Sequence, residues 1–216
     1  MDSVAAVSVS IDELTVADEP GAWAALGFAV DADTVVLGAT RVRLAGAASG
    51  KGLVGWSLRG AGPAELDGLA ATRSQRPPPA QAPAHPNGVT GLDHVVAVSP
   101  ALERTVAALG AAGLDLRRIR EEPTPAGAPR QAFFRLGPTI LEVVQEPAEA
   151  TAKAGGDRPA FFWGLALTAP DLDATVAALG ERVSEARAAV QPGRRIATLR
   201  RAAGLGLPVA LITPPA

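Results

Sequence analysis

Apolar and polar positions in residues 90–147 follow the pattern of one strand, one helix and three further strands. The mostly apolar run Leu92–Val98 predicts a buried strand. Ser99 then suits a helix N-cap, and Pro100 suits the first helical position, where a proline loses no intrahelical hydrogen bond. Apolar side chains recur at helical spacing at Leu102, Val106 and Leu109. Later strands are predicted at residues 114–119, 131–136 and 139–145, which makes the order βαβββ.

Residues 160–214 repeat this order. The segment Thr105–Gly110 reappears unchanged as Thr175–Gly180, with a constant offset in residue number (175 − 105 = 70). A duplicated unit of this length buries its apolar face only against its copy, so we expect a ligand site between copies. The second unit is predicted to have a strand at 162–168, a helix at 171–179 and strands at 195–200 and 207–213. Its second strand, at 183–190, is weak, because an Ala- and Glu-rich sequence there also suits a helix.

The N-terminal region, residues 1–73, carries a fainter version of the pattern. A third copy is predicted as a strand at 11–16, a helix at 19–26 and strands at 30–37 and 40–44. Trp56 and Pro63 have the same seven-residue spacing as Trp163 and Pro170, so a fourth copy should open with a strand at 53–58 and a helix at 63–69.

A proline-rich segment, residues 74–88, separates this region from the paired modules of residues 89–216. Proline fixes φ and removes a backbone donor, and dense proline favours extended backbone. We therefore expect a semi-rigid linker with no helix or strand longer than a single turn.

Composition and charge limit the function classes. Lys+Arg 20 against Asp+Glu 22 gives a net charge of −2 (20 − 22), so no general basic field attracts nucleic acid or an anionic membrane. Apolar stretches end well before the ~20 residues of a membrane span, and the N-terminus lacks signal-peptide features, so a cytoplasmic protein is expected. Cysteine and tyrosine are absent, and His85 and His94 are the only histidines, too few for a three-histidine zinc site within one chain.

The tandem βαβββ order, with His94 on the opening strand Gly91–Val98 and Glu142 on the closing strand Ile140–Val144, resembles the vicinal oxygen chelate superfamily. Glyoxalase I, bleomycin-resistance proteins, methylmalonyl-CoA epimerase and extradiol dioxygenases belong to it. The resemblance covers about residues 90–214. It implies an α+β fold in which tandem modules form curved mixed sheets around a cavity, with the helices outside. It also implies that His94 and Glu142 face that cavity as metal ligands.

Half of the metal site that the resemblance implies is missing. At the same offset from His94, the second unit has Gly164 (94 + 70 = 164), and the last strand, residues 208–212, has no carboxylate. A divalent metal held by His94 and Glu142 alone should bind weakly and exchange readily.

His94 is therefore open to two interpretations. It is a metal ligand, helped by a third group such as Asp12 or Glu13 from the N-terminal copy, or it is a polar residue hydrogen-bonded within the sheet. His85 is expected to be a solvated loop residue. A two-histidine, one-carboxylate iron site would require it to fold back beside His94 and Glu142.

Glu142 is the candidate catalytic residue. If its face of the strand lines the cavity, the carboxylate is partly desolvated and suits proton abstraction or metal ligation; the alternative is a solvated glutamate facing outwards. Arginines at equivalent places in the two modules are candidates for binding a carboxylate or phosphate, and each is otherwise a solvated sheet residue: Arg130, Arg135, Arg195 and Arg200. Trp163, with Phe161 and Phe162, is expected either to line an apolar ligand pocket or to pack in the core.

These residues support three hypotheses of function. The first is a small-molecule binding protein with a degenerate metal site, whose arginines favour an anionic ligand. The alternative is a metal-assisted lyase, isomerase, epimerase or dioxygenase that uses His94 and Glu142. In the third, the degenerate copies serve assembly, through homodimer contacts between exposed edge strands.

Overall fold

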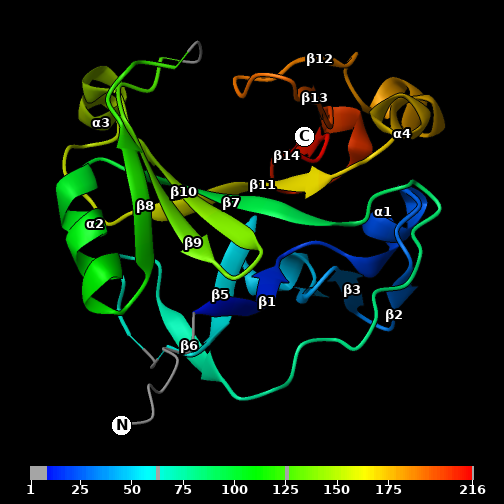
Figure 1. The fold of residues 1–216 in the computed structure, drawn as a ribbon, viewed down its shortest axis with the longest axis horizontal. Coiled ribbons are helices and arrows are strands. Elements are labelled where there is room, and N and C mark those ends of the chain that lie inside the picture. The colour runs from blue at the N-terminus through cyan, green and yellow to red at the C-terminus, as the bar shows by residue number, and fades with distance from the viewer. Residues whose placement is uncertain (1–8, 62–63, 125–126, 216) are drawn as a thin grey trace, which may run out of the picture.

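The N-terminal half of the chain folds into a six-stranded mixed sheet (Figure 1). A computed structural model describes residues 9–61, 64–124 and 127–215. The strand order is β2-β3-β4-β1-β5-β6. The elements are β1 (Ser10–Val16), α1 (Pro20–Ala25), β2 (Val30–Asp31), β3 (Thr34–Leu37), β4 (Thr40–Leu44), β5 (Leu53–Arg59) and β6 (Ala71–Ser74).

The C-terminal half folds into an eight-stranded mixed sheet of order β12-β13-β14-β11-β7-β10-β9-β8. Its first module contains β7 (Gly91–Ser99), α2 (Leu102–Ala111), β8 (Asp115–Arg120), β9 (Gln131–Leu136) and β10 (Thr139–Gln145), and a short helix, α3 (Ala148–Lys153), follows. Its second module contains β11 (Phe161–Thr168), α4 (Leu172–Leu179), β12 (Arg187–Ala188), β13 (Arg195–Thr198) and β14 (Val209–Ile212).

Both sheets follow one plan. The opening strands of two modules pair antiparallel at the centre, β1 with β5 and β7 with β11, and each is flanked by a parallel strand. In the eight-stranded sheet Val95 pairs with Leu165, its own equivalent in the second module (95 + 70 = 165), so the local two-fold axis passes through this pair. The α+β prediction, with tandem βαβββ modules in curved mixed sheets, is confirmed.

The helices cover the outer faces of the sheets, as predicted (Figure 1). Equivalent positions of the duplicated helices are buried: Leu102, Thr105 and Leu109 in α2, and Leu172, Thr175 and Leu179 in α4. The repeated segment is thus a repeated packing surface. No helix among the described residues combines the length and hydropathy that a membrane span requires.

Helix α2 begins two residues later than predicted. Its N-cap is Ala101, and the Ser99 hydroxyl accepts hydrogen bonds from the Ala101 N–H (3.0 Å) and the Thr105 hydroxyl (2.7 Å). Ser99 therefore ties the end of β7 to the first helical turn. In α4 the side chain of Asp171 caps the helix by accepting from the Ala174 N–H at 3.0 Å.

Several predicted elements differ in the structure. The helix predicted at 63–69 does not form over residues 64–69, where Ala64 bridges to Ala71 instead; Pro63 lies outside the described residues. The strand predicted at 30–37 is a hairpin that turns at Ala32, and the segment at 183–190 contributes only the two-residue strand β12. Periodicity does not distinguish these outcomes, because pairing between segments decides them: β2 pairs with β3, Ala64 bridges to Ala71, and β12 pairs with β13.

The proposed alignment of Trp56 with Trp163 is also wrong by two positions. Trp56 pairs with Leu14 at the centre of its sheet, where Leu165 pairs with Val95 in the other. Its indole is buried, donates to the Leu69 carbonyl (3.1 Å) and meets Phe162 edge-on at 5.1 Å. Trp56 thus packs between the two sheets, so the shared spacing to a proline was coincidental.

The proline-rich segment continues from the end of β6 at Ser74, and no helix or strand forms between Gln75 and Thr90. His85 corrects the expectation of a solvated residue, because it is 6% exposed. Its Nδ1 accepts from the Ala29 N–H (3.0 Å), so Nε2 carries the proton and donates to the Val36 carbonyl (3.0 Å). His85 therefore anchors the segment to the six-stranded sheet. Both of its ring nitrogens are hydrogen-bonded to backbone groups, so it is not placed to bind iron beside His94 and Glu142.

Candidate functional site

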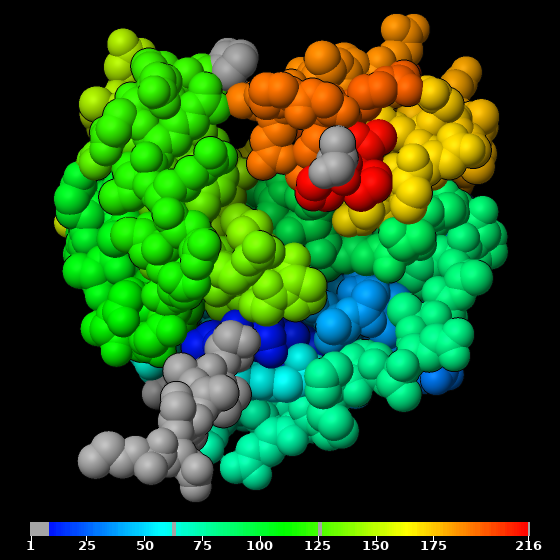
Figure 2. All heavy atoms as spheres, viewed as in Figure 1, coloured from blue at the N-terminus to red at the C-terminus, as the bar shows by residue number. Residues whose placement is uncertain are grey.

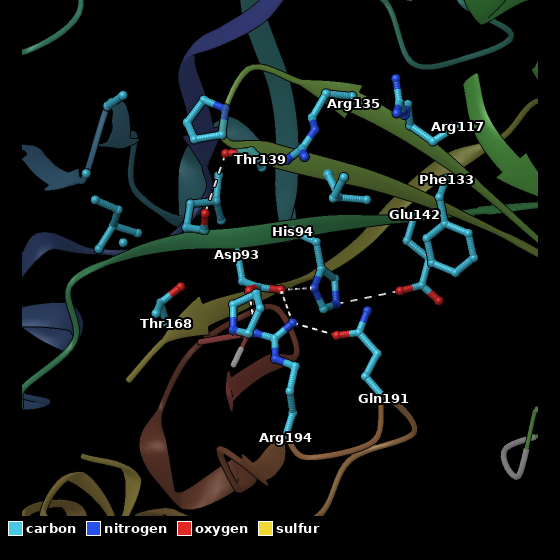
Figure 3. Close-up of a pocket in the computed structure, with 18 of the residues that line it drawn as sticks. Asp93, His94, Arg117, Phe133, Arg135, Thr139, Glu142, Thr168, Gln191 and Arg194 are labelled. Atoms are coloured by element: carbon cyan, nitrogen blue, oxygen red, sulfur yellow. Dashed lines mark hydrogen bonds and ion pairs between the residues drawn. The ribbon is translucent and has the colours of Figure 1, made fainter. Parts of the chain in front are cut away.

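A β-bulge in β7 brings Asp93 and His94 to the same cavity. Leu92 pairs with Leu167 and His94 with Ala166, so Asp93 is an extra residue with no partner on β11. In a regular strand, neighbouring side chains face opposite sides, but a bulge re-aims one of them. Both side chains line the cavity (Figure 3).

His94 and Glu142 face each other across two neighbouring strands. Strands β7 and β10 run parallel, and His94 Nε2 lies 3.6 Å from Glu142 Oε2. The side-chain amide of Gln131, on the adjacent strand β9, donates to Glu142 Oε1. Glu142 is thus held by Gln131 on one side. On its other side it faces His94, as Figure 3 shows.

Asp93 sets the orientation of the His94 ring. The His94 Nδ1 lies 2.8 Å from Asp93 Oδ2, and a carboxylate only accepts, so Nδ1 carries the proton. Burial opposes the ionisation of Asp93, but hydrogen bonds from His94 and Arg194 hold its pKa below the usual value. With Nδ1 bonded to Asp93, the other ring nitrogen, Nε2, faces the space beside Glu142.

The second module supplies the residue that holds Asp93. Arg194, 6% exposed, binds both Asp93 oxygens, with Nη1 at 3.3 Å from Oδ2. It also donates to Gln191 Oε1 (2.7 Å) and to the Thr213 carbonyl (2.6 Å). A buried guanidinium with all these partners is fixed in place. A continuous polar chain thus runs from Arg194 through Asp93 and His94 to Glu142.

The cavity has a volume of about 770 Å³ and opens between β8 and the segment around β12 and β13 (Figure 2). The floor carries His94 and Glu142. The β3–β4 turn of the six-stranded sheet, at Leu37–Ala39, forms part of the wall. A site between copies was expected, and the cavity is enclosed by both modules and by the N-terminal half.

Two arginines bring uncompensated positive charge to this cavity. Arg118, on β8, lies over the Phe133 ring at 4.6 Å, and Arg135 is on β9. Neither forms an ion pair with any of the described residues, whereas Arg117 pairs with Asp115 (3.1 Å) and Arg194 with Asp93. The excess of positive charge favours an anionic ligand.

Of the arginines chosen from the sequence, Arg135 lines the cavity and the others do not. Arg130 is engaged by Glu103 and Glu121, and Arg195 pairs with Asp173 at 2.6 Å. Arg200 follows the end of β13 and is exposed. A ligand-binding role for these three has no support from the cavity.

Trp163 is 50% exposed and is not part of the cavity wall. Phe161 lies beneath the Arg158 guanidinium at 5.3 Å, and Phe162 packs against Trp56. The register explains the exposure of Trp163: Phe162 pairs with Ala97 and Gly164 with Val96, so Trp163 is itself an extra, bulged residue. It is the equivalent of Asp93 in the second module (93 + 70 = 163).

Asp93, Arg194, Arg118 and Gln131 were missed in the sequence. Asp93 is adjacent to His94, so strict strand alternation places it on the opposite face. Arg194 is next to Arg195, and only the loop geometry separates their roles. The one usable signal was the Asp–His pair itself, since a carboxylate often orients a histidine that acts as ligand or base.

Two side chains in the cavity, His94 and Glu142, could act as ligands of a divalent metal ion. A separation of 3.6 Å suits two ligands that share one ion at about 2.0–2.2 Å each. However, a Cβ added at Gly164 would lie 2.5 Å from the Pro208 carbonyl oxygen, so no side chain fits there. Asp12 and Glu13 are bound by arginines of the six-stranded sheet, and no group of three or more His, Asp or Glu among the described residues could hold an ion.

The sequence matches no protein-family model and no curated protein. Among solved structures, it is similar to methylmalonyl-CoA epimerase from Mycobacterium tuberculosis, at 23% identity over 60% of this chain and 91% of that one, with a TM-score of 0.49. It is also similar to a variant of Streptomyces coelicolor methylmalonyl-CoA epimerase in complex with 2-nitronate-propionyl-CoA. The identity is 24% over 59% of this chain and 99% of that one, with a TM-score of 0.47. A hypothetical protein from Bacillus halodurans is 16% identical over 58% of this chain and 94% of that one, with a TM-score of 0.46. Overlap of this extent says nothing about substrate.

Proposed function

We propose that the protein binds a small organic anion in the cavity between its modules. The observation that carries this proposal is the pair Arg118 and Arg135, which line the cavity without an ion-pair partner among the described residues. A guanidinium binds a carboxylate or phosphate through two parallel hydrogen bonds. The cavity volume of about 770 Å³ is in the range of small-molecule sites.

Binding can be tested with 2-oxobutanoate, a small carboxylate whose carbonyl also activates a neighbouring C–H bond. We expect Arg135→Gln and Arg118→Gln each to weaken binding by about 10- to 100-fold, because a hydrogen bond to a charged group contributes about 1.5–3 kcal/mol. Arg130→Gln and Arg195→Gln are matched controls, since both arginines are held in ion pairs away from the cavity. Titration followed by NMR would measure all four, and equal losses in the controls would contradict the proposal.

A second candidate function is proton transfer at a carbon atom next to a carbonyl group. It is favoured by the His94–Glu142 pair, which lies 3.6 Å apart on the cavity floor. The Glu142 carboxylate would take the proton from carbon. The C–H electron pair would form the new C=C bond while the C=O π pair moves to the carbonyl oxygen, giving an enolate. Arg118 and Arg135 would stabilise the negative charge of the enolate. Delivery of a proton to the opposite face of the same carbon would complete an epimerisation, and delivery to a different carbon would complete an isomerisation.

Exchange of the C3 protons of 2-oxobutanoate for deuterium in D₂O measures this step directly. We expect Glu142→Gln to slow exchange by about 100-fold or more, as loss of a general base does, with binding retained. Glu13→Gln, in the six-stranded sheet, is the control and should exchange at the wild-type rate. Exchange that survives Glu142→Gln would exclude Glu142 as the base.

A divalent ion, if bound, would be held by His94 and Glu142 and would polarise the ligand carbonyl as a Lewis acid. With two protein donors, we expect weak binding that a chelator reverses. Elemental analysis of protein purified without a metal-chelating tag tests this. Stoichiometric metal that resists a chelator would contradict the weak site.

A further inference from the structure

A second hollow adjoins the first one. Its volume is about 450 Å³, and it lies between β8 and the β12–β13 segment. Both hollows are bounded by the same residues at their junction: His94, Arg118, Phe133, Glu142 and Gln191. The candidate reactive pair therefore stands between two compartments.

The two compartments differ in chemistry. Arg117, Arg118, Arg135 and Arg194 line the first compartment. The second compartment is bordered by branched apolar side chains: Ile119, Val190, Ile196 and Ile212. Arg120 and Glu122 on its rim pair with each other at 3.6 Å. Arg118, His94, Glu142 and Gln191 line both compartments. Of the two cavity arginines without an ion-pair partner among the described residues, Arg135 lines only the first compartment, and the four branched apolar side chains line only the second.

Two of the apolar side chains around the second compartment are unusually exposed. Val190 is 56% and Ile119 is 37% exposed, among the few large hydrophobic residues with this exposure in the described chain. Ile212, at the inner end, is 4% exposed. Apolar surface that is left uncovered around a concave site is typical of a ligand-binding site, because a ligand removes it from water.

We propose that the ligand is an amphiphilic anion that occupies both compartments at once. This inference rests on the proposed function and adds the class of ligand. The anionic group binds Arg118 and Arg135, an apolar chain lies among Ile119, Val190, Ile196 and Ile212, and the carbon between them lies beside His94 and Glu142. Arg118 marks the boundary, since its guanidinium lies over Phe133 at 4.6 Å, and both residues line both hollows.

The test is a series of 2-oxo acids from 2-oxobutanoate to 2-oxooctanoate, titrated against the full chain. We expect affinity to rise about two- to fourfold for each methylene group that enters the apolar compartment. Val190→Ser should weaken 2-oxooctanoate by about three- to tenfold and leave 2-oxobutanoate unchanged. Val54→Ser is the matched control, because Val54 is also exposed (41%) but lies in the six-stranded sheet. Ile196→Ser provides a second variant.

The outcomes separate this inference from the proposed function. Short acids that bind and depend on Arg135, with affinity independent of chain length, would overturn the amphiphilic ligand and leave the anion site. A chain-length dependence that neither Val190→Ser nor Ile196→Ser reduces would place the apolar chain elsewhere and also overturn the inference. Binding of no member of the series, with no effect of Arg135→Gln, would overturn the proposed function itself.

Discussion

The two sheets place different chemistry on the same backbone frame. Asp12 is an extra, bulged residue in β1, as Asp93 is in β7. By register, Glu13 then corresponds to His94, and Arg43 to Glu142.

In the six-stranded sheet, the carboxylates at these equivalent positions form ion pairs with arginines. Asp12 is fully buried. Its carboxylate forms ion pairs with Arg41, Arg59 and Arg76 and accepts a hydrogen bond from the Ser74 hydroxyl. Glu13 pairs with Arg43 (3.3 Å) and Arg76 (2.6 Å). The hollow beside them has about 460 Å³, against about 770 Å³ in the eight-stranded sheet.

Of the three equivalent residues in the eight-stranded sheet, Asp93, His94 and Glu142, only Asp93 pairs with an arginine among the described residues. His94 and Glu142 remain facing each other in the cavity. The difference shows that the backbone arrangement shared by the two sheets does not by itself determine what the side chains at equivalent positions do. A few side chains decide whether it becomes an ion-pair cluster that stabilises the fold or a site open to a ligand.

The largest expected effect is that of Asp12→Ala on stability. Removing one partner of a buried ion cluster leaves charge uncompensated, at a cost of about 3–5 kcal/mol in the free energy of unfolding. Asp93→Ala should cost less, because His94 and the cavity are accessible to water. Urea denaturation of both variants would show this order, and a smaller loss for Asp12→Ala would contradict the comparison.

Gly164 and Gly55 test the frame itself, because they are equivalent residues on β11 and β5. A Cβ at Gly164 meets the Pro208 carbonyl at 2.5 Å, whereas a Cβ at Gly55 meets nothing within 4 Å. We expect Gly164→Ala to destabilise the fold by about 1–3 kcal/mol, as overpacking does, and Gly55→Ala to be near neutral. Thermal unfolding would measure the stability of both variants. If Gly164→Ala left the stability unchanged, position 164 would have room for a metal-ligating side chain.

Arg194→Gln should separate the site from the fold. Without the guanidinium, Asp93 loses a partner that keeps its pKa low, and His94 loses its fixed orientation. We expect a reduction of about tenfold in C3 exchange of 2-oxobutanoate, within the range for loss of a positioning contact. The ¹⁵N shifts of His94 would report a change in its hydrogen bond to Asp93, and Arg195→Gln should leave them unaltered.

The smallest expected effect is a pH dependence from His85. Burial lowers the pKa of His85 below 6.5, although its hydrogen bond to Val36 opposes this. The unfolded chain then binds more protons, so stability should fall as pH decreases from about 6.5 towards the lowered folded pKa.

Urea midpoints between pH 7.5 and 5 would measure this slope, and His85→Gln should reduce it. Asp12 and Asp93 also have lowered pKa values, but their contribution is lost only as the pH falls below their ordinary value of 3.8. An unchanged slope in His85→Gln would assign the effect to other groups.

Periodicity was enough to predict most elements and the module order. The strands at residues 131–136 and 139–145 have the predicted bounds, and the repeated helix buries equivalent side chains. Apolar spacing carries this information locally, because each element must bury one face. The failures were at residues 30–37, 63–69 and 183–190, where pairing with a neighbouring segment, which periodicity does not record, decided the structure.

The candidate site was predicted in part. His94 and Glu142 could be chosen because polar side chains stand out on apolar strands and match a known pattern. Arg135 could be chosen only together with Arg130, Arg195 and Arg200, since a strand residue's face depends on its register with neighbours. The localisation, the homodimer and the division into separate regions stay predictions.

The sequence by itself determined the duplicated modules, the buried faces and the absence of two of the expected metal ligands, because these follow from residue identity and local spacing. The tertiary structure decided that Asp93 faces the same cavity as His94, since a bulge in one strand is defined only by its pairing with another. It also decided that Arg194 of the second module holds Asp93 of the first, 101 residues away. Contacts of that range depend on how the whole sheet closes, which no local pattern records.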